Sequence, residues 1–145
     1  MKRIFLWLFV LQFVYIIILR WIDPPFTITQ AVSLIKGNGL KRDYASYNDI
    51  NISAKLSVMA GEDQLFPDHN GFDVKAIKKA VKYNEKHPTK VRGASTISQQ
   101  LAKNVFLWQG GGIFRKGLEV YFTFMIETFW SKKRILQMFM GNLMI

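Results

Sequence analysis

The sequence of 145 residues contains no cysteine and only two histidines, His69 and His87. The absence of cysteine excludes a disulfide framework and any metal site built from thiolates. Two histidines also argue against a histidine-rich metal site. The chain has no internal repeat, and it lacks the run of alternating apolar and polar residues that predicts a half-buried strand. These absences favour a mainly helical protein.

Charge is absent from one long stretch near the amino terminus. Residues 4–19 are apolar except for Gln12, and two basic residues precede them. With the residues through Ile22, the stretch is long enough for a membrane-spanning helix, which needs roughly 17 to 25 mostly apolar residues. A cleavable signal peptide is the competing interpretation, but its apolar region is shorter and ends in small residues. We therefore expect an uncleaved anchor at residues 1–22, with the amino terminus in the cytoplasm and the remaining residues outside.

The formal net charge is +10, and seven basic side chains fall within one segment. These residues are Lys75, Lys78, Lys79, Lys82, Lys86, Lys90 and Arg92. A basic segment can indicate a nucleic-acid surface, but no nucleic-acid-binding motif accompanies this one. We interpret the segment as the solvated face of a helix that is attracted to anionic lipid headgroups, and we expect no nucleic-acid partner.

Past the anchor, the spacing of apolar residues predicts further helices. They are expected at about 29–36, 50–59, 73–85, from 95 onward, at about 114–130 and from 131 onward. The predicted amino-terminal caps are Asp73, Ser95 and Ser131.

Two of these helices have a clear apolar face. On the helix that follows Asp73, the residues expected to face inward are Val74, Ile77, Ala80 and Val81. On the helix that follows Ser95, they are Ile97, Leu101 and Val105, whereas Gln99, Gln100 and Lys103 are expected to project elsewhere.

Adjacent carboxylates, Glu62 and Asp63, stand at a predicted boundary between a helix and a loop, close to His69. A partly desolvated carboxylate in such a place can act as a general base. The alternative is that one of the two acids caps the helix or pairs with a lysine and does no chemistry. Glu119 lies one helical turn beyond Arg115, which also fits an ordinary ion pair worth about 0.2–0.5 kcal/mol.

A polar run opens the helix predicted from residue 95. It consists of Ser95, Thr96, Ser98, Gln99 and Gln100, followed by Lys103 and Asn104. A helix start offers unpaired amide donors and the positive end of the dipole, which suit a phosphate or a sugar hydroxyl. Capping by Ser95 would explain that residue alone, but not the two glutamines or the residues after them.

Four motifs in this order resemble those of the peptidoglycan glycosyltransferases, and most closely the monofunctional biosynthetic enzymes with one amino-terminal membrane helix. The first, EDQ-F-x-x-H-x-GFD, begins at Glu62, and the second, similar to GGSTI(S/T)QQ-x-x-KN-x-FL, begins at Gly93. The third, RK-x-x-E, begins at Arg115, and the fourth, KK-x-IL, begins at Lys132. The resemblance extends from the anchor to about Leu136.

The resemblance implies a lysozyme-like, mostly helical domain on the outer face of the bacterial cytoplasmic membrane, held there by a single membrane helix. It divides the chain into an anchor at 1–22, a membrane-proximal linker with a short helix at 23–49 and a partial glycosyltransferase domain at 50–145.

The chain departs from the family pattern at several positions. Ala94 replaces the second glycine of the second motif, residues 110–112 are glycines where the family usually has an arginine, and Gly141 occupies the usual asparagine position. Family members continue for several tens of residues, so we expect a carboxyl-terminally truncated, incomplete domain. Its apolar surface from Phe114 to Met140 would then be exposed.

Such enzymes polymerise lipid II into β-1,4 glycan strands and release undecaprenyl diphosphate. By motif position, Glu62 would be the general base and Glu119 the second carboxylate, near the donor. The expected substrate-binding residues are Ser95, Gln99, Gln100, Lys103, Asn104, Arg115 and Lys116, with Asp63 and His69 in support. The cationic ones would meet the diphosphate charge, and a divalent cation, Mg²⁺ or Mn²⁺, could share this task.

The partners that the resemblance implies are lipid II, the growing glycan strand, membrane lipid and other proteins of cell-wall synthesis. Two alternatives stay open: an inactive membrane protein that binds lipid II or a cell-wall partner, and a lysozyme-like enzyme that cleaves glycan. Cleavage would not call for a membrane anchor or for the cluster of glutamines and lysine. Intact Glu62 and Glu119 argue against long decay of the site.

Overall fold

The computed structural model describes residues 2–25, 27–35, 37 and 44–143. Its regular elements in these ranges are the helices α1 Lys2–Ile18, α2 Ile28–Ile35, α3 Ile52–Glu62, α4 Val74–Lys86, α5 Ile97–Phe106, α6 Ile113–Phe129 and α7 Lys132–Leu143. The prediction of a mainly helical protein is confirmed. The last residue predicted for the short helix near residue 29, Lys36, lies outside the described residues.

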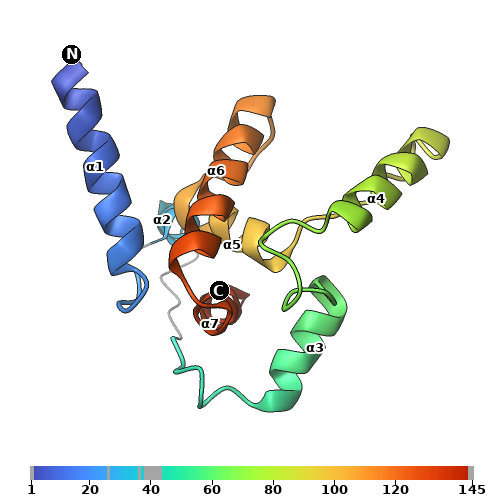
Figure 1. The fold of residues 1–145 in the computed structure, drawn as a ribbon, viewed down its shortest axis with the longest axis horizontal. Helices are drawn as coiled ribbons and strands as arrows, with labels where there is room; N and C mark the ends of the chain where they lie inside the picture. The colour runs from blue at the N-terminus through green and yellow to red at the C-terminus, as the bar shows by residue number, and fades with distance from the viewer. Residues whose placement is uncertain (1, 26, 36, 38–43, 144–145) are drawn as a thin grey trace.

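Helix α5 lies at the centre of the fold, where it contacts α2, α6 and α7 (Figure 1). Its residues Ile97, Leu101 and Val105 recur every fourth position and are buried on one face, as the sequence predicted. Burying a side chain of this size stabilises the folded state by about 1.5–3 kcal/mol. The core therefore fixes α5, and with it the polar residues at its amino-terminal end.

Apolar side chains at the end of α6 and along α7 are buried. Met125, Ile126, Trp130 and Phe139 all belong to the core that surrounds α5. The prediction of exposed apolar surface up to Met140 is therefore wrong for this half, because α5, α6 and α7 pack against one another. The exposed apolar side chains of α6 are Ile113 and Phe114 at its amino-terminal end, and Val120 and Phe124 further along.

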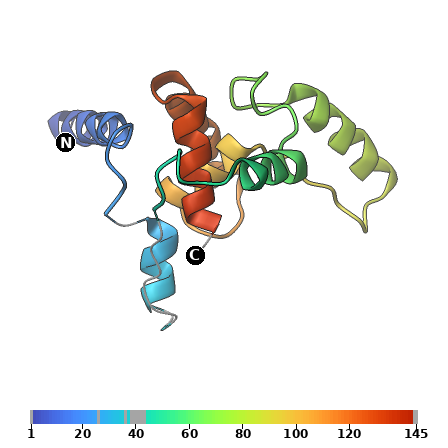
Figure 2. The ribbon, with the colours of Figure 1, turned by 90° about the horizontal axis from the view of Figure 1, so that it is seen from below.

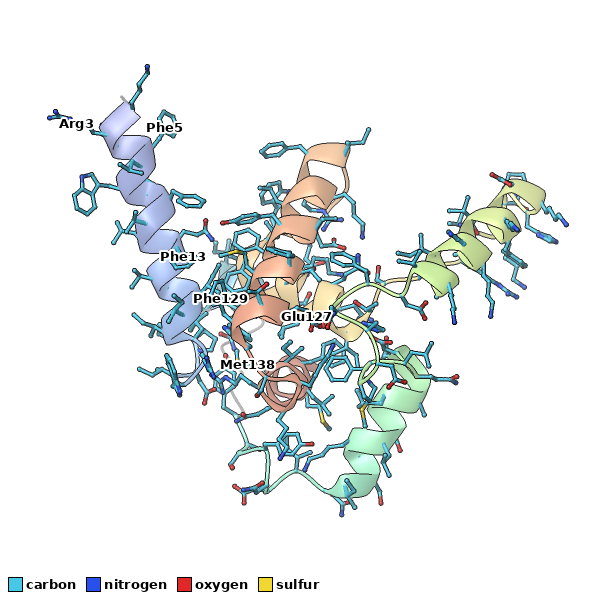
Figure 3. All side chains as sticks on the ribbon, viewed as in Figure 1. Arg3, Phe5, Phe13, Glu127, Phe129 and Met138 are labelled. Atoms are coloured by element: carbon cyan, nitrogen blue, oxygen red, sulfur yellow. The ribbon has the colours of Figure 1, made fainter. Side chains whose placement is uncertain are left out.

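Helix α1 packs against α6 through its carboxyl-terminal half. Phe13 meets Phe129 edge to face at 5.2 Å between ring centroids, and Trp130 Nε1 donates a hydrogen bond to the carbonyl oxygen of Ile16 at 2.8 Å. Arg3 and Phe5 lie at the opposite, free end of α1 (Figure 3). Among the described helices, none is at once long enough and apolar enough to cross a membrane.

The chain that leaves α1 is held by Arg134 of α7, a residue that the sequence gave no reason to single out. Its guanidinium donates to the carbonyl oxygens of Leu19 and Ile22 and pairs with Asp23 at 2.8 Å. Ser131 caps α7 as predicted, since its hydroxyl oxygen accepts a hydrogen bond from the Arg134 amide at 3.2 Å.

Helix α4 projects from the rest of the molecule in both views of the ribbon (Figures 1 and 2). Asp73 caps it as predicted, because its carboxylate accepts a hydrogen bond from the Ala76 amide at 2.8 Å. None of its residues is buried, and Val74 and Val81 are 56% and 51% exposed. The prediction that these two residues face inward is therefore wrong: α4 is amphipathic but stands outside the core.

Candidate functional site

Glu62 is the last residue of α3 and lies at the surface. Its carboxylate accepts a hydrogen bond from Gln100 Nε2 of α5 at 2.8 Å. A cavity of about 640 Å³ opens beside it, lined by residues 60–65, by the beginning of α4 and by residues 93–96 and 100. An exposed carboxylate, oriented by a side chain from the central helix, therefore lines a cavity large enough for a sugar.

Asp63 follows Glu62 directly but is only 7% exposed. Its carboxylate lies 2.9 Å from His69 Nε2 and accepts a hydrogen bond from the Ile97 amide, the first of α5, at 3.0 Å. Of the two adjacent acids, Asp63 thus makes the structural contacts, and its partner is a histidine rather than a lysine. The contact also ties the end of α3 to the start of α5.

The amino-terminal cap of α5 is Thr96, so the prediction of Ser95 as the cap is wrong. Thr96 Oγ1 accepts a hydrogen bond from the Gln99 amide, and Gln99 Oε1 accepts one from the Thr96 amide. This reciprocal capping box needs a glutamine or glutamate three residues after the cap, and only Thr96 has one. Gln99 is therefore buried instead of projecting outward, whereas Ser95 is exposed.

Glu119 is buried between two cations at the beginning of α6. Arg115 Nη1 pairs with one carboxylate oxygen at 2.8 Å, and Lys116 Nζ pairs with the other. The Lys116 side chain is 49% exposed and lines a second cavity of about 240 Å³, together with Arg92 and Ser95. Ala94 and Ser95 line both cavities, so the two adjoin.

Other predicted site residues lie apart from the two cavities. Lys103 and Asn104 follow Gln100 by one turn of α5, are half-buried and line neither cavity. Asn104 Oδ1 accepts a hydrogen bond from Gln109 Nε2 at 3.3 Å. The structure thus brings Glu62, Ser95 and Gln100 to the first cavity and leaves Lys103 and Asn104 one turn further along α5, outside both cavities.

Three basic residues that the sequence suggested only as a solvated surface line the cavities. Lys75 and Lys79 of α4 line the cavity beside Glu62, and Arg92 lines the second one. The sequence could have indicated that Lys75 and Lys79 point the same way, because residues four apart share one face of a helix. The Arg92 guanidinium also lies 3.7 Å from the ring centroid of Tyr83, which holds the segment after α4 in place.

No three histidine, aspartate or glutamate side chains in the described part of the chain lie close enough together to hold a metal ion. A divalent cation bound to a diphosphate commonly takes only one or two carboxylates from the protein, so the cation that the resemblance implies stays a prediction.

Comparison with known proteins gives a consistent family. A family model described as Transglycosylase matches residues 29–145. A biosynthetic peptidoglycan transglycosylase of Pseudomonas entomophila (strain L48) is 45% identical over 148 residues, covering 98% of this chain and 62% of that protein.

Two further relatives carry the same name. One, from Pseudomonas aeruginosa PAO1, is 44% identical, covering 97% of this chain and 64% of the relative. The other, from Xanthomonas axonopodis pv. citri (strain 306), is 48% identical, covering 87% of this chain and 54% of the relative. The chain therefore spans less than two thirds of the length of these curated relatives.

Proposed function

Because this chain belongs to the transglycosylase family, we propose that it is a peptidoglycan glycosyltransferase that polymerises lipid II into β-1,4 glycan strands and releases undecaprenyl diphosphate. The observation that carries the proposal is the position of Glu62. Its carboxylate is exposed on the wall of a cavity and oriented by Gln100. A base that is accessible to substrate and fixed in direction meets the geometric requirement for proton abstraction.

In the proposed reaction, the acceptor sugar occupies the cavity beside Glu62. The Glu62 carboxylate takes the proton of the 4-hydroxyl of N-acetylglucosamine, and that oxygen attacks the anomeric carbon of the growing strand. Lys75 and Lys79 line the same cavity and supply positive charge for anionic groups of the acceptor.

The donor occupies the second cavity in this proposal. As the new β-1,4 bond forms, the bond from the anomeric carbon to the α-linked diphosphate breaks, and its electron pair leaves with the diphosphate. Lys116 and Arg92 line this cavity and are placed to meet that charge, while Arg115 and Glu119 hold Lys116. Attack from the face opposite the leaving group inverts the configuration, so no glycosyl-enzyme intermediate is required.

The remaining motif residues have supporting parts in this proposal. Ser95 lines both cavities and would contact donor and acceptor where the two sugars meet. Gln99 would act through the cap of α5. For Lys103 and Asn104 we propose a contact with the lipid diphosphate, which rests on their motif position and on the positive charge of Lys103.

We further propose that α1 anchors the chain in the bacterial cytoplasmic membrane, with α2 to α7 on its outer face. The apolar side chains of α1 are mostly exposed, from Ile4 to Leu11. The helix has 17 residues, which at about 1.5 Å each gives about 26 Å. The turn 19–22, which is apolar except for Arg20, would extend it toward the roughly 30 Å of a bilayer core. An anchor would keep the enzyme beside substrates whose lipid tails remain in the bilayer.

The absence of cysteine permits a clean test of this topology. In intact spheroplasts, a membrane-impermeant maleimide should label Lys86→Cys, on exposed α4, and should leave Lys2→Cys unlabelled until the cells are lysed. Labelling of Lys2→Cys at the same rate as Lys86→Cys in intact cells would contradict the proposed orientation.

The activity is tested with detergent-solubilised protein and purified lipid II. We expect glycan strands that lysozyme digests, with about one undecaprenyl diphosphate released per disaccharide added, as the proposed displacement requires. Binding of lipid II without polymer would instead favour the lipid II-binding alternative. Shortening of added glycan strands would favour a lysozyme-like enzyme.

A further inference from the structure

The loop from Asp63 to Asp73 connects Glu62 to α4, and polar contacts from several helices hold it. At its beginning, Asp63 accepts a hydrogen bond from the Ile97 amide of α5 and contacts His69 Nε2. Near its end, the carbonyl oxygen of Gly71 accepts a hydrogen bond from Thr96 Oγ1 at 2.7 Å. The start of α5 therefore fixes the loop at two points.

Two charged residues hold the same loop from the opposite side. Lys132, the first residue of α7, donates a hydrogen bond to the carbonyl oxygen of His69 and pairs with Glu127 of α6 at 2.8 Å. Glu127 in turn accepts a hydrogen bond from Ser98 Oγ of α5. Glu127, labelled in Figure 3, thus links α6 to α5 and, through Lys132, to the loop.

These contacts form a closed circuit around the amino-terminal end of α5. It runs from Asp63 to His69, through Lys132 and Glu127 to Ser98, and back to Asp63 through the Ile97 amide. A closed circuit restrains each member from two directions, so displacing one member strains the others.

The Lys132 ammonium makes two hydrogen bonds and one ring contact. One reaches His69, one reaches Glu127, and the ammonium lies 4.5 Å from the ring centroid of Phe66, a distance typical of a cation–π contact. The Glu127 side chain is 7% exposed and that of Lys132 is 29% exposed. Removing one partner of such a pair leaves a largely buried charge uncompensated, which makes the pair sensitive to substitution.

Neither Glu127 nor Lys132 lines either of the two cavities that carry the proposed reaction. Their influence on the reaction must therefore pass through other residues. Glu62 immediately precedes the loop, and its carboxylate is bonded to Gln100, one turn along α5 from Ile97. The circuit therefore contains Asp63, which follows Glu62 directly, and Ile97, which lies one turn before Gln100.

We propose that Lys132 and Glu127 are positioning residues for Glu62: they hold the loop 63–73 against α5 and so aim the carboxylate into the cavity. This inference rests on the proposed role of Glu62 as the base. A displacement of about 1 Å at a reacting group can reduce the rate about 100-fold, even when the substituted residue lies outside the reacting site.

The kinetic test compares Lys132→Met with Lys133→Met, its exposed neighbour, in detergent-solubilised full-length chain with lipid II. We expect Lys132→Met to lower kcat by about 10- to 100-fold while KM stays within about threefold, because substrate contacts are unchanged. Lys132→Arg should recover most of kcat, since it keeps the charge and the donors. Lys133→Met should behave like the unsubstituted chain.

The proposal would be overturned if kcat of Lys132→Met fell only in proportion to the fraction of unfolded protein. It would also be overturned if that kcat stayed within about twofold of the Lys133→Met value. Glu127→Gln provides an independent variant, because it removes the charge of the pair while keeping the side-chain volume. It should lower kcat in the same direction with KM unchanged.

A second test of the proposal measures amide hydrogen exchange and does not depend on enzymatic activity. In Lys132→Met, the peptide covering residues 63–73 and the Ile97 amide should exchange about tenfold faster or more than in Lys133→Met. Unchanged exchange would overturn the positioning role. If the unsubstituted chain makes no polymer, the proposed function fails, while this exchange result still decides whether Lys132 holds the loop.

Discussion

Helices α4 and α5 are both amphipathic and both begin after a side chain that caps them, yet they occupy opposite environments. In α5, six of the ten residues are buried, whereas none of the 13 residues of α4 is. Apolar spacing identifies a helix, but burial depends on which other elements pack against it. The two helices also contribute differently to the candidate site. The buried helix α5 holds Gln100 beside Glu62. The projecting helix α4 places Lys75 and Lys79 along the cavity.

The largest effect on stability should come from truncating the buried helix. Leu101→Ala removes a fully buried side chain of α5 and should lower the free energy of unfolding by about 2–5 kcal/mol. Val81→Ala, on the 51% exposed position of α4, should change it by no more than about 0.5 kcal/mol. Denaturant unfolding of both variants in the same detergent measures the contrast. Equal losses would show that α4 is packed as tightly as α5.

A second, smaller effect should appear where the loop 63–73, which joins α3 to α4, touches α6. Gly71 has φ +84°, and a Cβ there would lie 2.8 Å from Thr123 Cγ2 and 2.9 Å from Glu127 Cγ. Gly71→Ala should therefore lower the free energy of unfolding by about 1–3 kcal/mol.

The matched control for Gly71 is Gly61, which lies inside α3 with nothing within 4 Å of an added Cβ. Gly61→Ala should be neutral or stabilising by up to about 1 kcal/mol, because alanine favours a helix more than glycine does. Thermal unfolding of Gly61→Ala and Gly71→Ala measures the change in stability of each variant. A loss for Gly61→Ala as large as that for Gly71→Ala would contradict the close approach at Gly71.

The smallest of the three effects concerns the cap of α5. Thr96→Ala removes the hydroxyl that accepts from the Gln99 amide and donates to the Gly71 carbonyl oxygen, and should cost about 0.5–2 kcal/mol. Ser95→Ala should change the free energy of unfolding by less than about 0.5 kcal/mol, since Ser95 is not the cap. A larger loss for Ser95→Ala than for Thr96→Ala would reverse the assignment.

Local patterns in the sequence predicted the helices and several of their ends. Asp73 and Ser131 were identified as caps because a polar acceptor directly precedes an apolar repeat. The prediction of Ser95 as the cap of α5 is wrong, although the sequence contains the signal for Thr96. Gln99 stands three residues after Thr96, which is the spacing of a capping box.

Long-range contacts had no such local pattern. Asp63 is bonded to the amide of Ile97, 34 residues away, and Lys132 is bonded to the carbonyl oxygen of His69, 63 residues away. The burial of the apolar side chains between Met125 and Met140 likewise depends on how α5, α6 and α7 pack together. Motif resemblance drew attention to Glu62 and Asp63 as a pair, but only the folded chain separates an exposed carboxylate from a buried one.

The initial rate of lipid II polymerisation by Glu62→Gln, relative to Glu85→Gln on exposed α4, tests the central claim most directly. Glutamine keeps the hydrogen-bonding shape of the side chain but cannot accept the proton. If Glu62 is the general base, its rate should fall by about 10²- to 10⁴-fold, while Glu85→Gln retains the rate of the unsubstituted chain. A Glu62→Gln variant within about tenfold of the Glu85→Gln rate would contradict the account.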